Sequence, residues 1–125
     1  MGIQSYRDLN VWQAAMSIAE ATYVLTKSFP QSELYGLTTQ MRRASVSIAA
    51  NIAEGNGRET SGAYVQFLRV SQGSLKELET HLFLAERVGL VDSQQTAPIL
   101  DECDKLGRML RALIRAIQDK ARAEK

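Results

Sequence analysis

Apolar residues recur with the period of an α-helix in four long segments, and only short connections separate these segments. The segments cover about residues 8–27, 32–55 and 61–87, and a fourth that starts near residue 93. Long amphipathic helices joined by short connections favour antiparallel neighbours. The sequence therefore predicts an all-α fold, an antiparallel up-down-up-down four-helix bundle, as a single domain over residues 1–125.

Residues with known helix-ending or helix-starting preferences mark the boundaries. Phe29-Pro30 ends the first segment, because the residue before a proline is disfavoured in the helical region. Ser32 is the predicted N-cap of the second segment, which stops at Gly55-Asn56-Gly57. Gly89 is the predicted C-cap of the third segment, and Asp92 or Ser93 is the predicted N-cap of the fourth.

One apolar stripe from each segment is predicted to form the core. On the first segment this stripe contains Trp12, Met16, Ala19 and Tyr23, which lie at i, i+4, i+7 and i+11. Across the four segments the predicted core contains Trp12, Met16, Met41, Ile48, Phe67, Leu75, Leu78, Leu110 and Leu113.

The first and third segments carry more apolar residues than one core-facing stripe needs. Val11, Ala15, Ile18 and Leu25 form a second stripe on the first segment, and Val65 and Phe83 point away from the Leu75 stripe on the third. Apolar surface outside the core-facing arc is typical of a contact with a partner. We expect self-association, with candidate interface residues Val11, Ile18, Leu25, Val65 and Phe83. Single exposed apolar side chains are the alternative interpretation.

The charge balance limits the functions that composition allows. Fifteen Lys and Arg against fourteen Asp and Glu give a net charge of +1, which excludes a strongly basic domain that coats nucleic acid by bulk charge.

No stretch approaches the about 18 apolar residues of a membrane span, and residues 1–10 do not resemble a secretory signal. One cysteine excludes an intrachain disulfide. We expect a cytoplasmic protein without a membrane partner.

No set of residues indicates catalysis. Carboxylate-bridged metal sites in helical bundles need two Glu-x-x-His motifs, whereas His81 is the single histidine. His81 is more simply a polar residue at the border of the core. Cys103 lies between Ile99 and Leu106 on an apolar face, where a cysteine behaves as a small buried hydrophobe. We therefore expect no catalytic residue, no metal site, no cofactor and no enzymatic activity.

The fourth segment carries arginines on one face. Arg108, Arg111, Arg115 and Arg122 lie at i, i+3, i+7 and i+14 and form a narrow stripe opposite the apolar face. Guanidinium groups present forked donors that match phosphate oxygens, so this stripe is a candidate nucleic-acid-binding surface. A solvated helix face with favourable cations near its C-terminus is the alternative interpretation.

Several sequence blocks together resemble the four-helix-bundle family of 23S rRNA intervening-sequence proteins. Leu9, Trp12 and Ala15 match its opening pattern, and the resemblance runs from about Tyr6 to Ile117. The blocks that carry it are FPQSELYGL at 29–37, QMRRASVSI at 40–48, NIAEG at 51–55, Phe67-Leu68 and GSLKELET at 73–80. Of these, the NIAEG block is the most specific. Ala49 departs from the pattern, because the family usually has proline there, and a proline would bend the second helix.

The resemblance implies a bacterial, cytosolic bundle without catalytic residues. Relatives of this kind assemble as ring-shaped homopentamers, and the architecture is similar to the accessory protein of diversity-generating retroelements, which binds nucleic acid and a reverse transcriptase. Four polar residues of the matching blocks, Arg43, Ser47, Asn51 and Glu54, share one side of the second helix, where they would bond across a helix or subunit contact.

Two functional hypotheses follow. The first is a non-enzymatic homo-oligomer, with five subunits favoured by the resemblance, that binds structured RNA or DNA through its arginine-rich surface. The second is a homo-oligomeric scaffold whose partner is another protein, without a nucleic-acid role. Salt dependence separates them, because phosphate contacts release counterions and weaken steeply with salt.

Overall fold

Four α-helices form the structure, which is a computed structural model that describes residues 5–124. The helices are α1 (Asn10–Thr26), α2 (Thr39–Asn56), α3 (Ser61–Arg87) and α4 (Ser93–Ala123). Three short helices accompany them: η1 (Tyr6–Asp8), η2 (Gln31–Glu33) and the π-helical η3 (Leu34–Thr38). None of the described residues lies in a β-strand, which confirms the predicted all-α class. The ends of the predicted domain, residues 1–4 and 125, lie outside the described residues.

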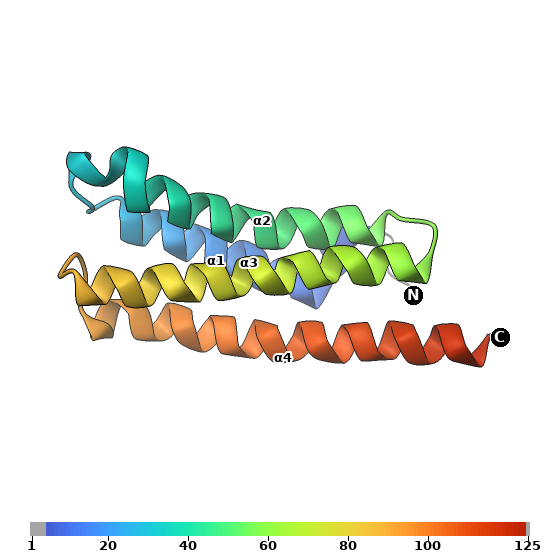
Figure 1. The fold of residues 1–125 in the computed structure, drawn as a ribbon. Helices are drawn as coiled ribbons and strands as arrows, with labels where there is room; N and C mark the ends of the chain where they lie inside the picture. The colour runs from blue at the N-terminus through green and yellow to red at the C-terminus, as the bar shows by residue number, and fades with distance from the viewer. Residues whose placement is uncertain (1–4, 125) are drawn as a thin grey trace.

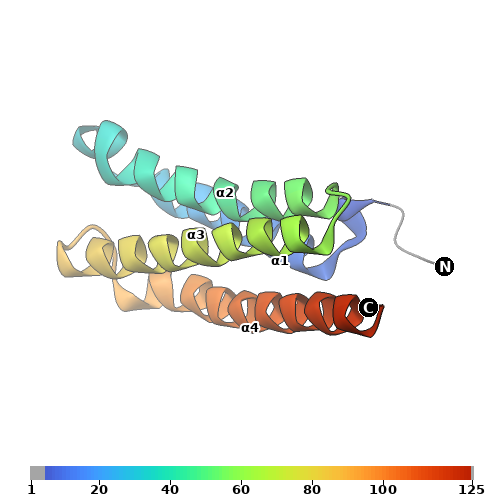
Figure 2. The same cartoon turned by 45° about the vertical axis from the view of Figure 1, so that its right-hand side comes forward.

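Successive α-helices run in opposite directions (Figure 1), as the prediction of an up-down-up-down bundle required. Each helix packs against two neighbours, in the order α1, α2, α3, α4 and back to α1. The N-terminal part of α2 diverges from the other helices, which Figure 2 shows most clearly.

The second helix begins later than the sequence predicted. Ser32 is not an N-cap of α2, because the backbone leaves the helical conformation at Gly36 (φ −110°, ψ −114°) and α2 starts only at Thr39. The Glu33 carboxylate accepts a hydrogen bond from the Leu37 amide at 3.3 Å, which spans this break. Beyond it, α2 passes through Ala49 as a continuous α-helix.

The connection between α3 and α4 follows the predicted signals. Gly89 adopts φ +81°, a left-handed conformation that other residues rarely adopt. Around it, the Leu90 amide donates to the Ala85 carbonyl and the Gly89 amide to the Glu86 carbonyl, the pattern of a Schellman motif. Asp92 caps α4 through a reciprocal pair of hydrogen bonds with Gln95.

Buried residues of all four α-helices form one hydrophobic cluster. Its members confirm the predicted core positions Met41, Ile48, Leu75, Leu78 and Leu110, all of which are buried. The other four predicted core residues are less buried than the sequence predicted. Trp12, Met16 and Leu113 are only partly buried against this cluster.

Phe67 is likewise only half-buried. It lies beneath the Arg58 guanidinium, whose carbon is 4.7 Å from the ring centroid.

Four of the five predicted interface residues lie in the core of the monomer instead. Val11, Ile18 and Leu25 are 6%, 1% and 8% exposed, because α1 turns its second stripe inward and leaves the Trp12 stripe at the edge. Trp12 carries a polar atom that favours such a half-buried position, and Tyr23 of the same stripe is exposed. Val65 is 8% exposed because α4 is long enough for Gln118 and Ala121 to lie beside it. Only Phe83, at 51%, remains an exposed candidate.

The core makes a direct stability prediction. We expect Leu78→Ala to lower the free energy of unfolding by about 2–5 kcal/mol, because a fully buried leucine leaves a cavity when truncated. The matched control is Val70→Ala on the exposed side of the same helix, which we expect to cost far less. Urea denaturation measures both, and equal losses would contradict the assigned core.

Candidate functional site

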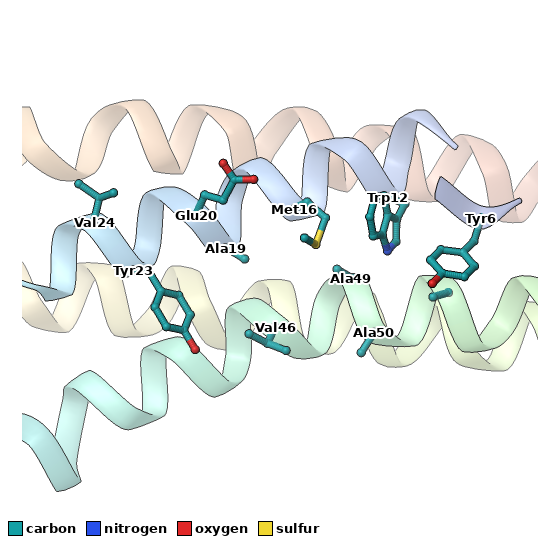
Figure 3. A pocket seen from close by; sticks show the side chains of 11 residues that line it. Tyr6, Trp12, Met16, Ala19, Glu20, Tyr23, Val24, Val46, Ala49 and Ala50 are labelled. Atoms are coloured by element: carbon teal, nitrogen blue, oxygen red, sulfur yellow. The ribbon is translucent and has the colours of Figure 1, made fainter. Parts of the chain in front are cut away.

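An apolar groove with a volume of about 760 Å³ lies between α1 and α2. Tyr6, Trp12, Met16, Ala19, Glu20, Tyr23 and Val24 line one side, and Val46, Ala49, Ala50 and Ala53 of α2 line the other (Figure 3). We call it the α1/α2 groove. Small alanines on α2 leave space between the two helices that larger side chains would fill. Glu20 points away from α2, so its carboxylate does not enter the groove.

Aromatic side chains mark both ends of the α1/α2 groove. At one end the rings of Tyr6 and Trp12 pack edge to face, with centroids 5.4 Å apart. At the other end the Arg42 guanidinium lies 4.6 Å from the Tyr23 ring centroid and donates a hydrogen bond to Thr26 at 2.9 Å. Tyr23 and Val24 are exposed, as is Val46 across the groove. Aromatic rings, methionine and aliphatic side chains in one concave surface are typical of a protein contact.

The four arginines predicted for nucleic-acid binding lie on the exposed face of one continuous helix, α4. Two of them have acidic partners: Arg108 pairs with Asp104 at 3.0 Å and Arg122 with Asp119 at 3.4 Å. The side chains of Arg111 and Arg115 take part in no hydrogen bond or ion pair with any residue from 5 to 124. The available positive charge is therefore concentrated at the centre of the stripe.

A second, smaller groove lies between α3 and α4 and has a volume of about 300 Å³. We call it the α3/α4 groove; it is lined by Gln72, Leu75, Lys76, Cys103, Asp104, Gly107, Arg108 and Arg111. It brings a lysine of α3 together with two of the predicted arginines of α4. Sequence reasoning missed both grooves, and the only signals were Ala49, Ala50 and Ala53 in α2 and Gly107 inside α4.

One of the four polar residues in the matching blocks, Ser47, connects α2 to α3. Ser47 and Ser74 share a hydrogen bond at 2.8 Å between their hydroxyl oxygens, and Asn51 Nδ2 donates to the Ser47 carbonyl and hydroxyl. The Ser47 bond to Ser74 is the predicted contact across a helix, whereas the Asn51 side chain bonds only to Ser47 within α2. The side chains of Arg43 and Glu54 are exposed and make no hydrogen bond or ion pair within the described residues.

The remaining residues of the NIAEG block also have packing roles. Ile52 is completely buried. A Cβ at Gly55 would lie 2.8 Å from Phe67 Cβ, which is closer than real Cβ contacts, and at a tight 3.2 Å from the Tyr64 carbonyl oxygen. Only glycine permits α2 and α3 to approach so closely at this point, so the specificity of the block is largely explained by helix packing.

Cys103 and His81 lie where the sequence predicted. Cys103 is buried, and burial raises the pKa of its thiol to about 12, so the thiol is protonated and unreactive at neutral pH. His81 Nε2 lies 3.7 Å from Glu77 Oε2 at the border of the core.

Residues 5–124 contain no group of three or more His, Cys, Asp or Glu side chains that could hold a metal ion. No helix among them is both long and apolar enough to cross a membrane.

Two glycines provide a test of the α2–α3 contact. We expect Gly55→Ala to lower the free energy of unfolding by about 1–3 kcal/mol, because the added methyl overlaps Phe67. Gly73→Ala in the exposed middle of α3 has no heavy atom within 4 Å of the new Cβ and should raise stability by about 0.5–1 kcal/mol. Chemical denaturation of both variants measures the difference, and a stabilising Gly55→Ala would show that the contact is not tight.

The fold is an antiparallel four-helix bundle with a groove between α1 and α2 and another between α3 and α4. Residues 7–112 match the model of the 23S rRNA-intervening sequence protein family, and the chain belongs to this family. The fold is also similar to the crystal structure, at 1.70 Å, of a protein of unknown function from the S23 ribosomal protein family of Bacteroides thetaiotaomicron VPI-5482. The TM-score is 0.75 at 20% identity, over 83% of this chain and 97% of that one. No curated protein matches the sequence.

Proposed function

We propose that this chain is a non-enzymatic, cytoplasmic homo-oligomer that binds nucleic acid, in particular structured RNA, through the arginine face of α4. The observation that carries the proposal is the pair Arg111 and Arg115, two exposed guanidinium groups one helical turn apart without acidic partners among the described residues. Each guanidinium can bind a phosphate in a bidentate manner.

The low net charge of a single subunit is the reason that the proposal includes assembly. A subunit with a net charge of +1 attracts phosphate weakly, and Asp104 and Asp119 neutralise two of the four arginines. A closed homo-oligomer repeats the free Arg111 and Arg115 pair once per subunit. Several weak sites on one assembly then bind a single nucleic acid with high avidity.

The α1/α2 groove and Phe83 support self-association. A cyclic assembly uses two different surfaces in each contact, one on each subunit. The α1/α2 groove is concave and apolar, whereas Phe83, Leu84 and Val88 are exposed apolar side chains on and just beyond α3. Five subunits remain the favoured number, on the basis of the resemblance.

The second candidate function is a protein-binding scaffold without a nucleic-acid role. The size and apolar lining of the α1/α2 groove favour it, because such a groove accommodates the apolar face of a helix from another protein.

Self-association is tested by placing a charge in either surface. We expect Ala50→Glu and, separately, Phe83→Glu to dissociate the oligomer, because each buries an unpaired carboxylate in an apolar contact. Both positions are exposed in the monomer, so the fold should survive. Light scattering gives the mass and circular dichroism the helicity. A monomer mass for the unchanged protein would overturn the proposed assembly.

Nucleic-acid binding is tested by reversing the free charges on α4. We expect the double variant Arg111→Glu, Arg115→Glu to abolish binding of a structured RNA while mass and helicity stay unchanged. Fluorescence anisotropy at two salt concentrations measures the affinity, whose logarithm should fall steeply with the logarithm of salt in the unchanged protein.

The matched control is the double variant Arg69→Glu, Arg87→Glu, which changes the net charge equally but on the exposed side of α3. It should retain most of the affinity. If the unchanged protein binds neither structured RNA nor duplex DNA at low salt, the scaffold function replaces this one. If both double variants bind equally well, the nucleic-acid site lies elsewhere.

A further inference from the structure

The α3/α4 groove collects donors from two helices around one small hollow. Lys76 and Gln72 of α3 line one side, and Arg108 and Arg111 of α4 line the other. Its volume of about 300 Å³ is at the lower end of the range for small-ligand sites. Positively charged groups that converge from two helices are a suitable environment for a single phosphate group.

The existing ion pairs leave one guanidinium in this groove available. The Lys76 ammonium lies 3.0 Å from Glu79, and Arg108 lies 3.0 Å from Asp104, the one acidic residue that lines the groove. Arg111 has no such partner among the described residues. An incoming phosphate would thus meet the unpaired guanidinium of Arg111. The Gln72 amide lies around it, together with Lys76 and Arg108, whose charges already have acidic partners.

Gly107 is a second, independent indication that the groove is kept open. Glycine in a helix interior is unfavourable, and packing does not require it here, because an added Cβ would make only an ordinary contact of 3.7 Å with Leu75 Cδ2. Gly107 lines the groove beside Leu75 and Cys103. An alanine would fill part of this space with a methyl group, so the glycine makes the groove deeper at a cost in stability.

We propose that the α3/α4 groove binds one backbone phosphate of the nucleic acid, with Arg111 as its principal ligand and Gly107 providing the space for it. This inference rests on the proposed function and assigns it a specific site. It distinguishes Arg111 from Arg115, which lies one turn further along the same face but does not line the groove.

Two matched pairs of variants test the assignment in the full-length protein. Arg111→Gln should weaken binding of a fluorescent RNA stem-loop about tenfold or more, since it removes a charge-assisted hydrogen-bonded pair. Arg115→Gln removes the same charge outside the groove and should weaken it much less. Gly107→Ala should raise Tm by roughly 2–6 °C yet weaken RNA binding. Gly73→Ala, a mid-helix glycine that does not line the groove, should raise Tm and leave binding unchanged.

Each outcome decides between the site and the broader function. If the unchanged protein binds the stem-loop but Arg111→Gln and Gly107→Ala behave as their controls, the groove is not the phosphate site, whereas the proposed function stands. If the unchanged protein binds no RNA, both fail. Inorganic phosphate serves as a separate probe. If it raises Tm in the unchanged protein and not in Gly107→Ala while RNA does not bind, the groove binds free phosphate and the assignment to nucleic acid is overturned.

Discussion

The close contact between α2 and α3 is the constraint on which the rest of the bundle depends. It is the most extensive contact between helices, and it combines a glycine that cannot carry a side chain with hydroxyl bonds across the interface. The buried Ser71 hydroxyl donates to the Ile48 carbonyl at 2.9 Å, which satisfies a polar group within the core. Because these contacts fix the distance and register of α2 and α3, the other two helices pack against a defined pair.

The outer surfaces follow from how α1 completes this arrangement. α1 packs between α2 and α4 with its aliphatic stripe inward, and it directs Trp12, Met16 and Tyr23 toward the small alanines of α2. The N-terminal end of α2 diverges after the backbone break at Gly36 (Figure 2). Small residues on one helix and large, partly exposed residues on the other leave a groove between the two helices. The groove is thus a consequence of the packing that forms the core.

Much of the fold could be predicted from the sequence, because periodicity and capping are local signals. The Asp92 cap, the Gly89 turn and the stripes of α3 and α4 required no knowledge of the other helices. The face of α1 could not be predicted in this way. Both of its stripes have helical spacing, and which one is buried depends on the shapes of α2 and α4. The burial of Val65 could not be predicted for the same reason, because the residues beside it come from the C-terminal part of α4. The break at Gly36 could not be predicted either, because the pattern of apolar residues continues through the non-helical backbone.

The candidate sites show how little a net charge says about a surface. The sequence predicted the arginine stripe correctly as an exposed face of α4, but spacing alone did not distinguish its four members. Asp104 and Asp119 lie on the same face and neutralise Arg108 and Arg122, which leaves the central pair available. Of that pair, only Arg111 lies beside a hollow that a lysine from another helix also lines. A nearly neutral chain can therefore present a local site for an anion, since Asp104 and Asp119 pair with Arg108 and Arg122 and leave the Arg111 guanidinium unpaired among the described residues.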